Sequence, residues 1–122
     1  MTSFIALTAI GISGNKYELW AYPNRTVLQR VSGVYVFCRW VPDGHWVADY
    51  VGQAVDLNGR AGVGFGLHEK AADAVSLGTT HTAVMSVTGT EQFRCWVEND
   101  LIQSLGPPLN KIAPPGHGKR WA

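Results

Sequence analysis

The sequence lacks an excess of charge of either sign, and it has few cysteines. Ten lysines and arginines nearly balance nine aspartates and glutamates, so the net charge of the 122-residue chain is +1. Any contact with nucleic acid must therefore depend on a local basic patch. The two cysteines, Cys38 and Cys95, lie in apolar surroundings, where a buried thiol is commoner than a disulfide or a metal ligand. We expect both thiols to be buried.

Several common functional motifs are missing as well. Neither cysteine stands near a second ligand at a zinc-binding spacing. The glycine-rich run at 62–66 lacks the Lys-Ser/Thr ending of a phosphate-binding loop. The apolar stretch at 1–11 has no basic leader and is too short to span a bilayer. We therefore expect no zinc site, no nucleotide-binding loop and no membrane partner, and a cytoplasmic location.

The residues that are present are typical of one folded domain. Hydrophobic residues make up 46% of the chain and charged residues 16%, a composition that excludes disorder of the whole. The size is sufficient for one buried core. Residues 4–10 and 17–22 read as strands around a turn at 11–15, which predicts an N-terminal β-hairpin.

A second hairpin is predicted in the middle of the chain. Gly33 opens a β-rich run that ends at Trp40, and turn residues at 42–44 precede a returning strand at 45–51. This hairpin carries Tyr35 and Tyr50. The predicted class is α+β, with a small antiparallel or mixed sheet flanked by helices and extended by the N-terminal hairpin.

Helical patterns dominate the second half of the chain. Asp56 is a suitable N-cap for a short helix at 57–61, which would present Arg60 outward. The glycines at 62–66 predict an irregular loop, followed by a helix at 68–75 and a strand at 80–87. The strongest helix runs from the N-cap Thr90 to Leu105, and its core-facing stripe is expected to contain Phe93, Trp96, Val97, Leu101 and Leu105. Glu98 falls just off that stripe. The basic segment at 111–122 is expected to be a flexible tail.

Taken singly, the polar residues have ordinary explanations as packing, surface or turn residues. Their order is more informative: Gly33-Val34-Tyr35, then Tyr50-Val51-Gly52, then Arg60, Glu98 and Asn110. This order resembles the GIY-YIG nuclease domain over residues 33–110, with 1–30 as an N-terminal extension and 111–122 as the tail.

The resemblance implies a metal-dependent endonuclease that hydrolyses DNA phosphodiester bonds. Glu98 would hold one Mg²⁺ or Mn²⁺, an ion that prefers oxygen ligands and keeps several waters. Tyr35 would act as general base on water, beside Tyr50. Since a free phenol titrates near pH 10, the pKa of Tyr35 would have to be lowered, and Arg60 or the metal could do so while neutralising charge on the phosphate. Asn110 would fix the backbone near Glu98 or touch the substrate.

One position departs from the family pattern. Many members place a histidine or tyrosine one helical turn after the arginine, where this chain has Gly64. His68 could take that place as a proton shuttle if the glycine-rich segment folds back. We expect His81 to be structural, in a strand beside the catalytic hairpin, and His45 and His117 to be exposed.

Two other interpretations stay open. A non-catalytic nucleic-acid-binding module would keep the fold and a phosphate-facing Arg60 while Gly64 marked decayed chemistry. A structural or protein-interaction domain would tolerate replacement of Arg60 and Glu98. The expected partner of the enzyme is double-stranded or branched DNA, and a homodimer is possible; the basic tail could add salt-sensitive contacts to phosphates.

Overall fold

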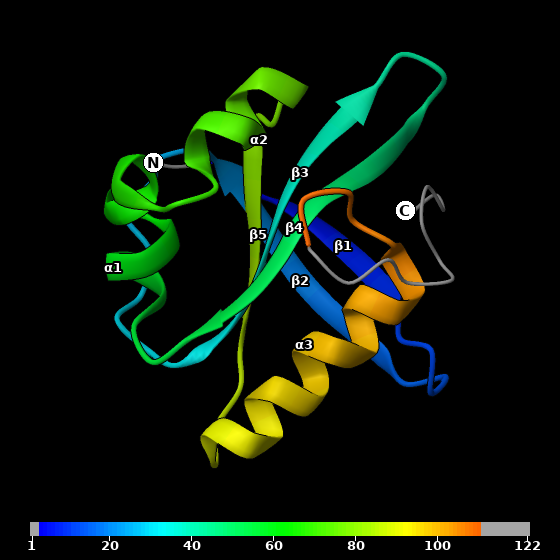
Figure 1. The fold of residues 1–122 in the computed structure, drawn as a ribbon, viewed down its shortest axis with the longest axis vertical. Helices are drawn as coiled ribbons and strands as arrows, with labels where there is room; N and C mark the ends of the chain where they lie inside the picture. Colours follow the sequence, from blue (N-terminus) through cyan, green and yellow to red (C-terminus); the bar gives the residue numbers. More distant parts are fainter. Residues whose placement is uncertain (1–2, 111–122) are drawn as a thin grey trace.

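The computed structural model describes residues 3–110, and its centre is an antiparallel sheet of five strands (Figure 1). The strands are β1 (Ile5–Ile10), β2 (Lys16–Pro23), β3 (Gly33–Val41), β4 (His45–Ala54) and β5 (His81–Ser86). Their order across the sheet is β1-β2-β5-β3-β4, so β1 and β4 are the two edges. The sheet curls, and helices pack on both of its faces.

Both predicted hairpins are confirmed. β1 pairs with β2, and β3 pairs with β4, each in antiparallel register. β5 pairs with β3 on one side and with β2 on the other, so the strand that carries His81 lies beside the central hairpin as expected. The α+β class with an antiparallel sheet, flanking helices and an N-terminal hairpin is therefore correct.

The part of the chain that the structure describes also has four helical segments: α1 (Leu57–Ala61), the 3-10 helix η1 (Val63–Leu67), α2 (Ala71–Leu77) and α3 (Glu91–Leu105). The predicted N-caps are confirmed, because the Asp56 carboxylate accepts from the Gly59 N–H and the Thr90 hydroxyl accepts from the Phe93 N–H. Across residues 3–110, no helix is long and apolar enough to cross a membrane.

The prediction of an irregular loop at 62–66 is wrong. These residues enter η1, where the N–H of Phe65 donates to the Gly62 carbonyl and the Phe65 ring is fully buried. Burial of this one large side chain compensates for the poor helix propensity of its glycine neighbours. The next helix begins at Ala71 rather than at His68, since the backbone of His68 is extended.

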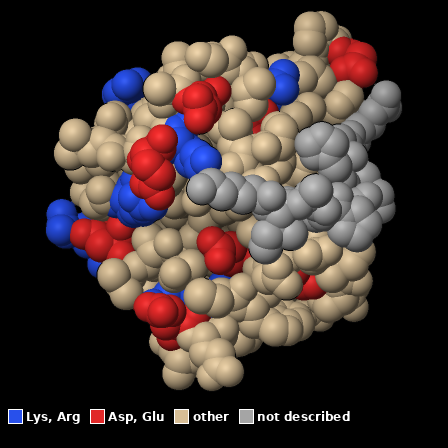
Figure 2. All heavy atoms as spheres, in the orientation of Figure 1, with Lys and Arg blue, Asp and Glu red and all other residues tan. Residues whose placement is uncertain are grey.

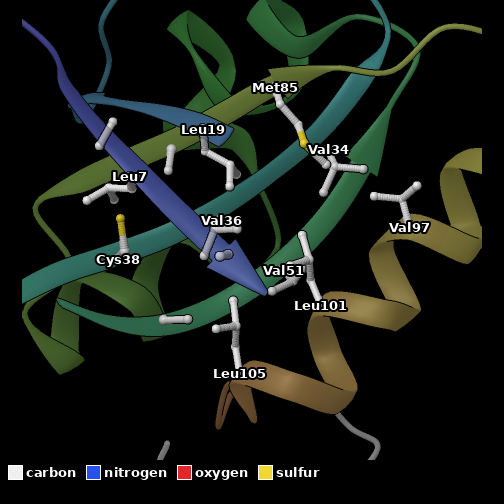
Figure 3. Close-up of a cluster of buried hydrophobic side chains, with 14 of the residues drawn as sticks. Leu7, Leu19, Val34, Val36, Cys38, Val51, Met85, Val97, Leu101 and Leu105 are labelled. Carbon is white, nitrogen blue, oxygen red and sulfur yellow. The ribbon is translucent and has the colours of Figure 1, made fainter. Parts of the chain in front are cut away.

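Two hydrophobic clusters lie on opposite faces of the sheet. In the first, Val97, Leu101 and Leu105 of α3 point toward Val34, Val36 and Val51 of the sheet (Figure 3). In the second, Tyr35 and Phe37 pack with α1, η1 and α2. Alternation along β3 explains this division, because successive side chains point to opposite faces. β3 is consequently buried on both faces from Gly33 to Cys38.

The expected apolar stripe of α3 was too broad. Val97, Leu101 and Leu105 are buried as predicted, but Phe93 and Trp96 are exposed by 49% and 48%. In the first turns of α3, the buried residue is Arg94 instead. Cys95 lies on the same outward side and is exposed, contrary to prediction, whereas Cys38 in the middle of β3 is buried.

The Asp100 side chain is a main link between the N-terminal hairpin and α3, beside hydrogen bonds from the Ser104 hydroxyl to the Ile10 carbonyl and from the Ile12 N–H to the Asp100 carbonyl. Asp100, which is buried, accepts hydrogen bonds from the Ser13 N–H at 2.8 Å, the Ser13 hydroxyl at 2.7 Å and the Tyr17 hydroxyl at 2.7 Å. A Cβ at position 11 would lie 1.9 Å from an Asp100 oxygen, so Gly11 is needed for this approach. The predicted flexible tail at 111–122 lies outside the described residues.

Candidate active site

The candidate site is built around Tyr35, whose ring crosses the neighbouring strand above Gly52. The two residues are register partners between β3 and β4. A Cβ at position 52 would lie 2.3 Å from the Tyr35 hydroxyl oxygen. Only glycine leaves room for the phenol at this point. Gly52 therefore positions Tyr35, and the Tyr35 hydroxyl reaches toward the outer edge of the sheet.

His68 holds the Tyr35 hydroxyl. Its Nε2 lies 2.7 Å from the Tyr35 Oη, and the N–H of Lys70 donates to its Nδ1 at 2.9 Å. Since Nδ1 accepts, the proton of the neutral ring is on Nε2, and Nε2–H donates to the Tyr35 oxygen. In this tautomer His68 stabilises negative charge on Tyr35. The expected role of proton shuttle does not fit it, because Nε2 is already protonated.

The structure also explains why position 64 has no side chain. A Cβ at Gly64 would lie 1.7 Å from the carbonyl oxygen of Gly59. α1 ends at Ala61, and the tight turn into η1 brings these backbones together. The turn folds the chain back, so that His68 rather than residue 64 reaches Tyr35.

Burial dominates the protonation of both partners. It raises the pKa of Tyr35 above its ordinary value, with a further contribution from Tyr50, and the nearby Arg60 offsets only part of this. The pKa of Tyr35 was expected to be lowered, but within the protein burial raises it overall. Burial, together with the Arg60 charge, lowers the pKa of His68 to about 4. At neutral pH Tyr35 is a phenol and His68 is a neutral imidazole.

Arg60 lies beside Tyr35 and pairs with Glu69. Its Nη2 is 2.5 Å from the Glu69 Oε1, and the two side chains are exposed by 39% and 58%. The hydrogen bond from Arg60 lowers the pKa of Glu69 to about 2. Surface ion pairs are weak, so a phosphate could displace Glu69 from the guanidinium at small cost. The sequence contained no signal for Glu69 as the partner of Arg60, because η1 makes their spacing irregular.

A β-bulge and a polar clamp position Tyr50. The β3–β4 register shifts between Phe37 and Cys38, which leaves Asp49 as the extra residue before Tyr50. Leu109 N–H donates to the Asp49 carbonyl at 3.0 Å. The Asn110 amide accepts from the Val51 N–H at 3.0 Å and donates to the Val51 carbonyl at 2.9 Å. Asn110 thus fixes the backbone beside Tyr50 rather than beside Glu98.

Asp49 itself is a buried residue that the sequence analysis missed. Its carboxylate accepts from the Arg39 Nε at 3.1 Å and from the Thr79 hydroxyl at 2.6 Å. Burial raises its pKa, while Thr79 and Arg39 act in the opposite direction. These contacts tie the bulge to the segment before β5, and they identify Asp49 as part of the support for Tyr50.

Glu98 approaches the same edge of β4 from α3. Its pKa is raised by burial and lowered in part by a hydrogen bond from the Gln53 N–H. It is close enough to Tyr50 to raise the pKa of that phenol. Arg94, one turn earlier on α3, donates through Nε to the Gln53 side chain at 3.0 Å. Gln53 therefore connects two α3 side chains to the edge strand, which the sequence gave no reason to expect.

Helices from both faces of the sheet thus meet at the outer edge of β4. The structure brings Tyr35, Tyr50, Arg60 and His68 into one cluster and places Glu98 beside Tyr50, while Asn110 supports the backbone. Neither His45 nor His81 is part of this cluster. His81 packs on Trp46, with ring centroids 5.1 Å apart. His45 is half-buried beside Asp43 rather than exposed, and His117 lies outside the described residues.

Two hollows border the cluster. One, of about 310 Å³, is lined by Tyr50, Glu69, Lys70, Leu109 and Asn110. The other, of about 380 Å³, has Arg60 and Arg94 as its cations and Asp56 and Glu91 as its acids. Figure 2 shows basic and acidic side chains interspersed on the side of α1 and α2, without an extended field of one sign. Attraction of an anion would be local to the arginines.

Comparisons with models of known protein families, with curated proteins and with solved structures find no match to this chain.

Proposed function

We propose that the protein is a metal-dependent endonuclease of the GIY-YIG type that hydrolyses DNA phosphodiester bonds. The observation that carries this proposal is the set of groups around Tyr35. One side of its oxygen receives the His68 Nε2–H, Arg60 lies beside it, and the Glu98 carboxylate lies beyond Tyr50. A base, a cation for phosphate and an anion for a metal are the parts that phosphodiester hydrolysis needs.

Glu98 fits the role of metal ligand. It is half-buried, burial raises its pKa, and no ion pair joins it to another of residues 3–110. Those residues contain no group of three or more His, Cys, Asp or Glu side chains that could enclose a metal. Mg²⁺ or Mn²⁺ can be held by one carboxylate together with substrate phosphate and water. When bound, the ion would polarise the phosphoryl oxygen and offset charge on the leaving group.

Tyr35 in its phenolate form would accept the proton of the attacking water. The water oxygen then forms the new bond to phosphorus, and the bond from phosphorus to the leaving oxygen breaks. The His68 Nε2–H donates a hydrogen bond to the Tyr35 oxygen, and Arg60 places positive charge beside it. Both interactions favour the phenolate form of Tyr35. Arg60 would move from Glu69 to the phosphate. Because burial keeps the Tyr35 pKa high, the cleavage rate should rise with pH by about tenfold per unit in the alkaline range.

The alternative is a non-catalytic module that binds nucleic acid. The observation that favours it is the same raised pKa of Tyr35, since a phenol that stays protonated is no base. In that case Arg60 and Lys70 would contact phosphates without any cleavage.

Cleavage assays separate the two functions. Supercoiled plasmid and branched oligonucleotides are incubated with Mg²⁺, Mn²⁺ or chelator, using wild type, Tyr35→Phe, Glu98→Gln and the exposed control Glu18→Gln. We expect cleavage only with metal. The cleavage rate should fall by about 100- to 10,000-fold in Tyr35→Phe and should stay unchanged in Glu18→Gln. Glu98→Gln should bind DNA without cutting it.

Cleavage that persists in chelator or in Glu98→Gln would contradict the proposed mechanism. Retention of DNA by wild type without cleavage under any metal would instead establish the binding module. A rate that does not change with pH would exclude Tyr35 as the base.

A further inference from the structure

A third hollow lies on the same face of the sheet as Tyr35 but nearer the N-terminal hairpin. Its volume is about 340 Å³, and its aromatic lining comes from Phe4, Trp20 and Tyr22. Phe4 and Trp20 are exposed by 53% and 39%, and the rings of Phe4 and Tyr22 are 5.9 Å apart. Large apolar side chains that stay open to solvent around a hollow indicate a binding surface. We call these three aromatic residues and the space between them the aromatic hollow.

The strand register fixes the position of this hollow relative to the site. Trp20 is the partner of Val84, and Val84 is the partner of Tyr35, so the three residues form one row across β2, β5 and β3. Residues in such a row share a face, and adjacent strands are about 4.8 Å apart. Trp20 therefore lies about 10 Å from Tyr35 in the sheet, a span of about three stacked nucleotides.

Arginines connect the two places. Arg60 and Arg94 line the hollow next to the site, and that hollow also contains Asp56. Arg30 pairs with Asp56 at 2.6 Å, and its side chain is 71% exposed. The neighbours of Arg30 in the chain, Gln29 and Val31, line the aromatic hollow. Arg60 and Arg30 thus lie between Tyr35 and the aromatic hollow, each paired with an acid at the surface. Because such surface ion pairs are weak, linked phosphates of a strand would displace the two carboxylates at small cost.

The chemistry of the lining selects a nucleobase. An indole and a phenyl ring offer flat apolar surfaces, and the polar residues Thr26, Gln29 and Ser86 also line the hollow. A base has a π-face for the rings and polar edges for the amide and hydroxyls. A base inside a duplex is already stacked and paired, so only an unpaired base could enter.

We infer that the aromatic hollow binds an unpaired base of a DNA strand whose phosphates follow Arg30 and Arg60 to Tyr35. This inference rests on the proposed function, and it narrows the substrate class to DNA that has a single-stranded overhang, flap or branch next to the cleavage site. The N-terminal hairpin, which supplies Trp20 and Tyr22, is then the part of the chain that recognises this feature.

Fluorescence anisotropy in metal-free buffer tests the inference without cleavage. The full-length protein is titrated into a labelled single strand, a blunt duplex and the same duplex with an unpaired overhang. We expect Trp20→Ala to weaken binding of the single strand and the overhang by about 5- to 150-fold and to leave the blunt duplex unchanged. Trp20→Phe, which keeps a stacking surface, should stay near wild type.

Trp40→Ala is the matched control. Trp40 is exposed by 57% and lies on the β3–β4 hairpin, outside the lining of the aromatic hollow. Equal losses in Trp20→Ala and Trp40→Ala, or equal losses for duplex and single strand, would overturn the inference. So would a wild-type dimer in sedimentation that Trp20→Ala converts to monomer with unchanged DNA binding, since a second copy would then cover the hollow. Thermal unfolding of each variant identifies any loss caused by misfolding.

The result is separable from the proposed hydrolysis. If wild type cuts plasmid with Mg²⁺ while Trp20→Ala changes no affinity, the hydrolase stands and the base-binding hollow is wrong. If the selective loss of affinity is found but nothing is cut, the hollow stands and the hydrolysis is wrong.

Discussion

The tautomer of His68 determines what the Tyr35 hydroxyl can do. The Lys70 N–H donates to Nδ1, so Nε2 carries the proton and donates to the phenol oxygen. Each nitrogen of the neutral ring therefore already has a hydrogen-bond partner within the protein. Protonation of the ring would place a hydrogen on Nδ1, directly against the Lys70 N–H. The buried ring therefore opposes protonation, in agreement with its lowered pKa.

The lowered pKa of His68 predicts that the free energy of unfolding depends on pH. In the unfolded chain a histidine binds its proton near pH 6.5, but folded His68 resists until about pH 4. Between these values the unfolded state binds more protons, so the free energy of unfolding falls as the pH falls, by up to about 3 kcal/mol from this residue. His68→Gln should show a shallower loss than wild type in urea denaturation at pH 7 and pH 4. Parallel losses in the two proteins would show that His68 is not the group responsible.

At the scale of elements, the edge strand β4 is held from three directions. β3 pairs with its inner side, the segment at 107–110 bonds to Asp49 and Val51 on its outer side, and α3 reaches it through Gln53. These contacts cover part of an edge that would otherwise offer unpaired backbone groups. They also position Tyr50 and Glu98, so the site depends on the same contacts that close the sheet edge.

Asp100 has the corresponding role for the opposite edge, and its removal should loosen the N-terminal hairpin. Asp100→Asn replaces an acceptor of three hydrogen bonds by a group that presents a donor to Ser13 and Tyr17. We expect a loss of about 3 kcal/mol in the free energy of unfolding, measured by urea denaturation. The exposed neighbour Asn99→Ala should change it by less than about 0.5 kcal/mol.

Hydrogen exchange locates the effect of Asp100→Asn. Amides of β1 and β2 should lose more protection than those of β3 and β4, because only the first hairpin is fastened by this carboxylate. A uniform loss of protection across the sheet would show that the hairpin and the β3–β4 pair open together.

For the whole molecule, the two cysteines are probes of opposite kinds. Cys38 lies in the central strand β3, and burial raises the pKa of its thiol. Cys95 is exposed on the outer side of α3. A thiol reagent should modify Cys95 at once and Cys38 only after the sheet opens, at least about 1,000-fold more slowly.

Labelling of Cys38 in the Cys95→Ser variant should therefore measure global unfolding. The labelling rate is expected to rise with urea in parallel with the loss of secondary structure followed by circular dichroism. Fast labelling that does not respond to urea would mean that β3 separates from β5 or β4 by a local opening.

Much of the fold follows from local sequence signals. The alternation of β2, the turn at Pro42 and Gly44, and the N-caps Asp56 and Thr90 each act within a few residues, and each was predicted correctly. The buried face of α3 was predicted only in part. Helical periodicity alone did not show that the sheet would accept Arg94 beside Gln53 and leave Phe93 in solvent.

The order of tyrosines, arginine, glutamate and asparagine in the sequence selected the residues of the candidate site. Their contacts were decided only by the tertiary structure: the folding back at Gly64 that delivers His68, the bulge at Asp49, and the clamp of Asn110 on Val51. The same holds for the ionisation of Tyr35, whose raised pKa results from burial between two layers. Local patterns determine which elements form because their hydrogen bonds and caps are short-range, whereas burial and charge pairing arise only when distant segments pack together.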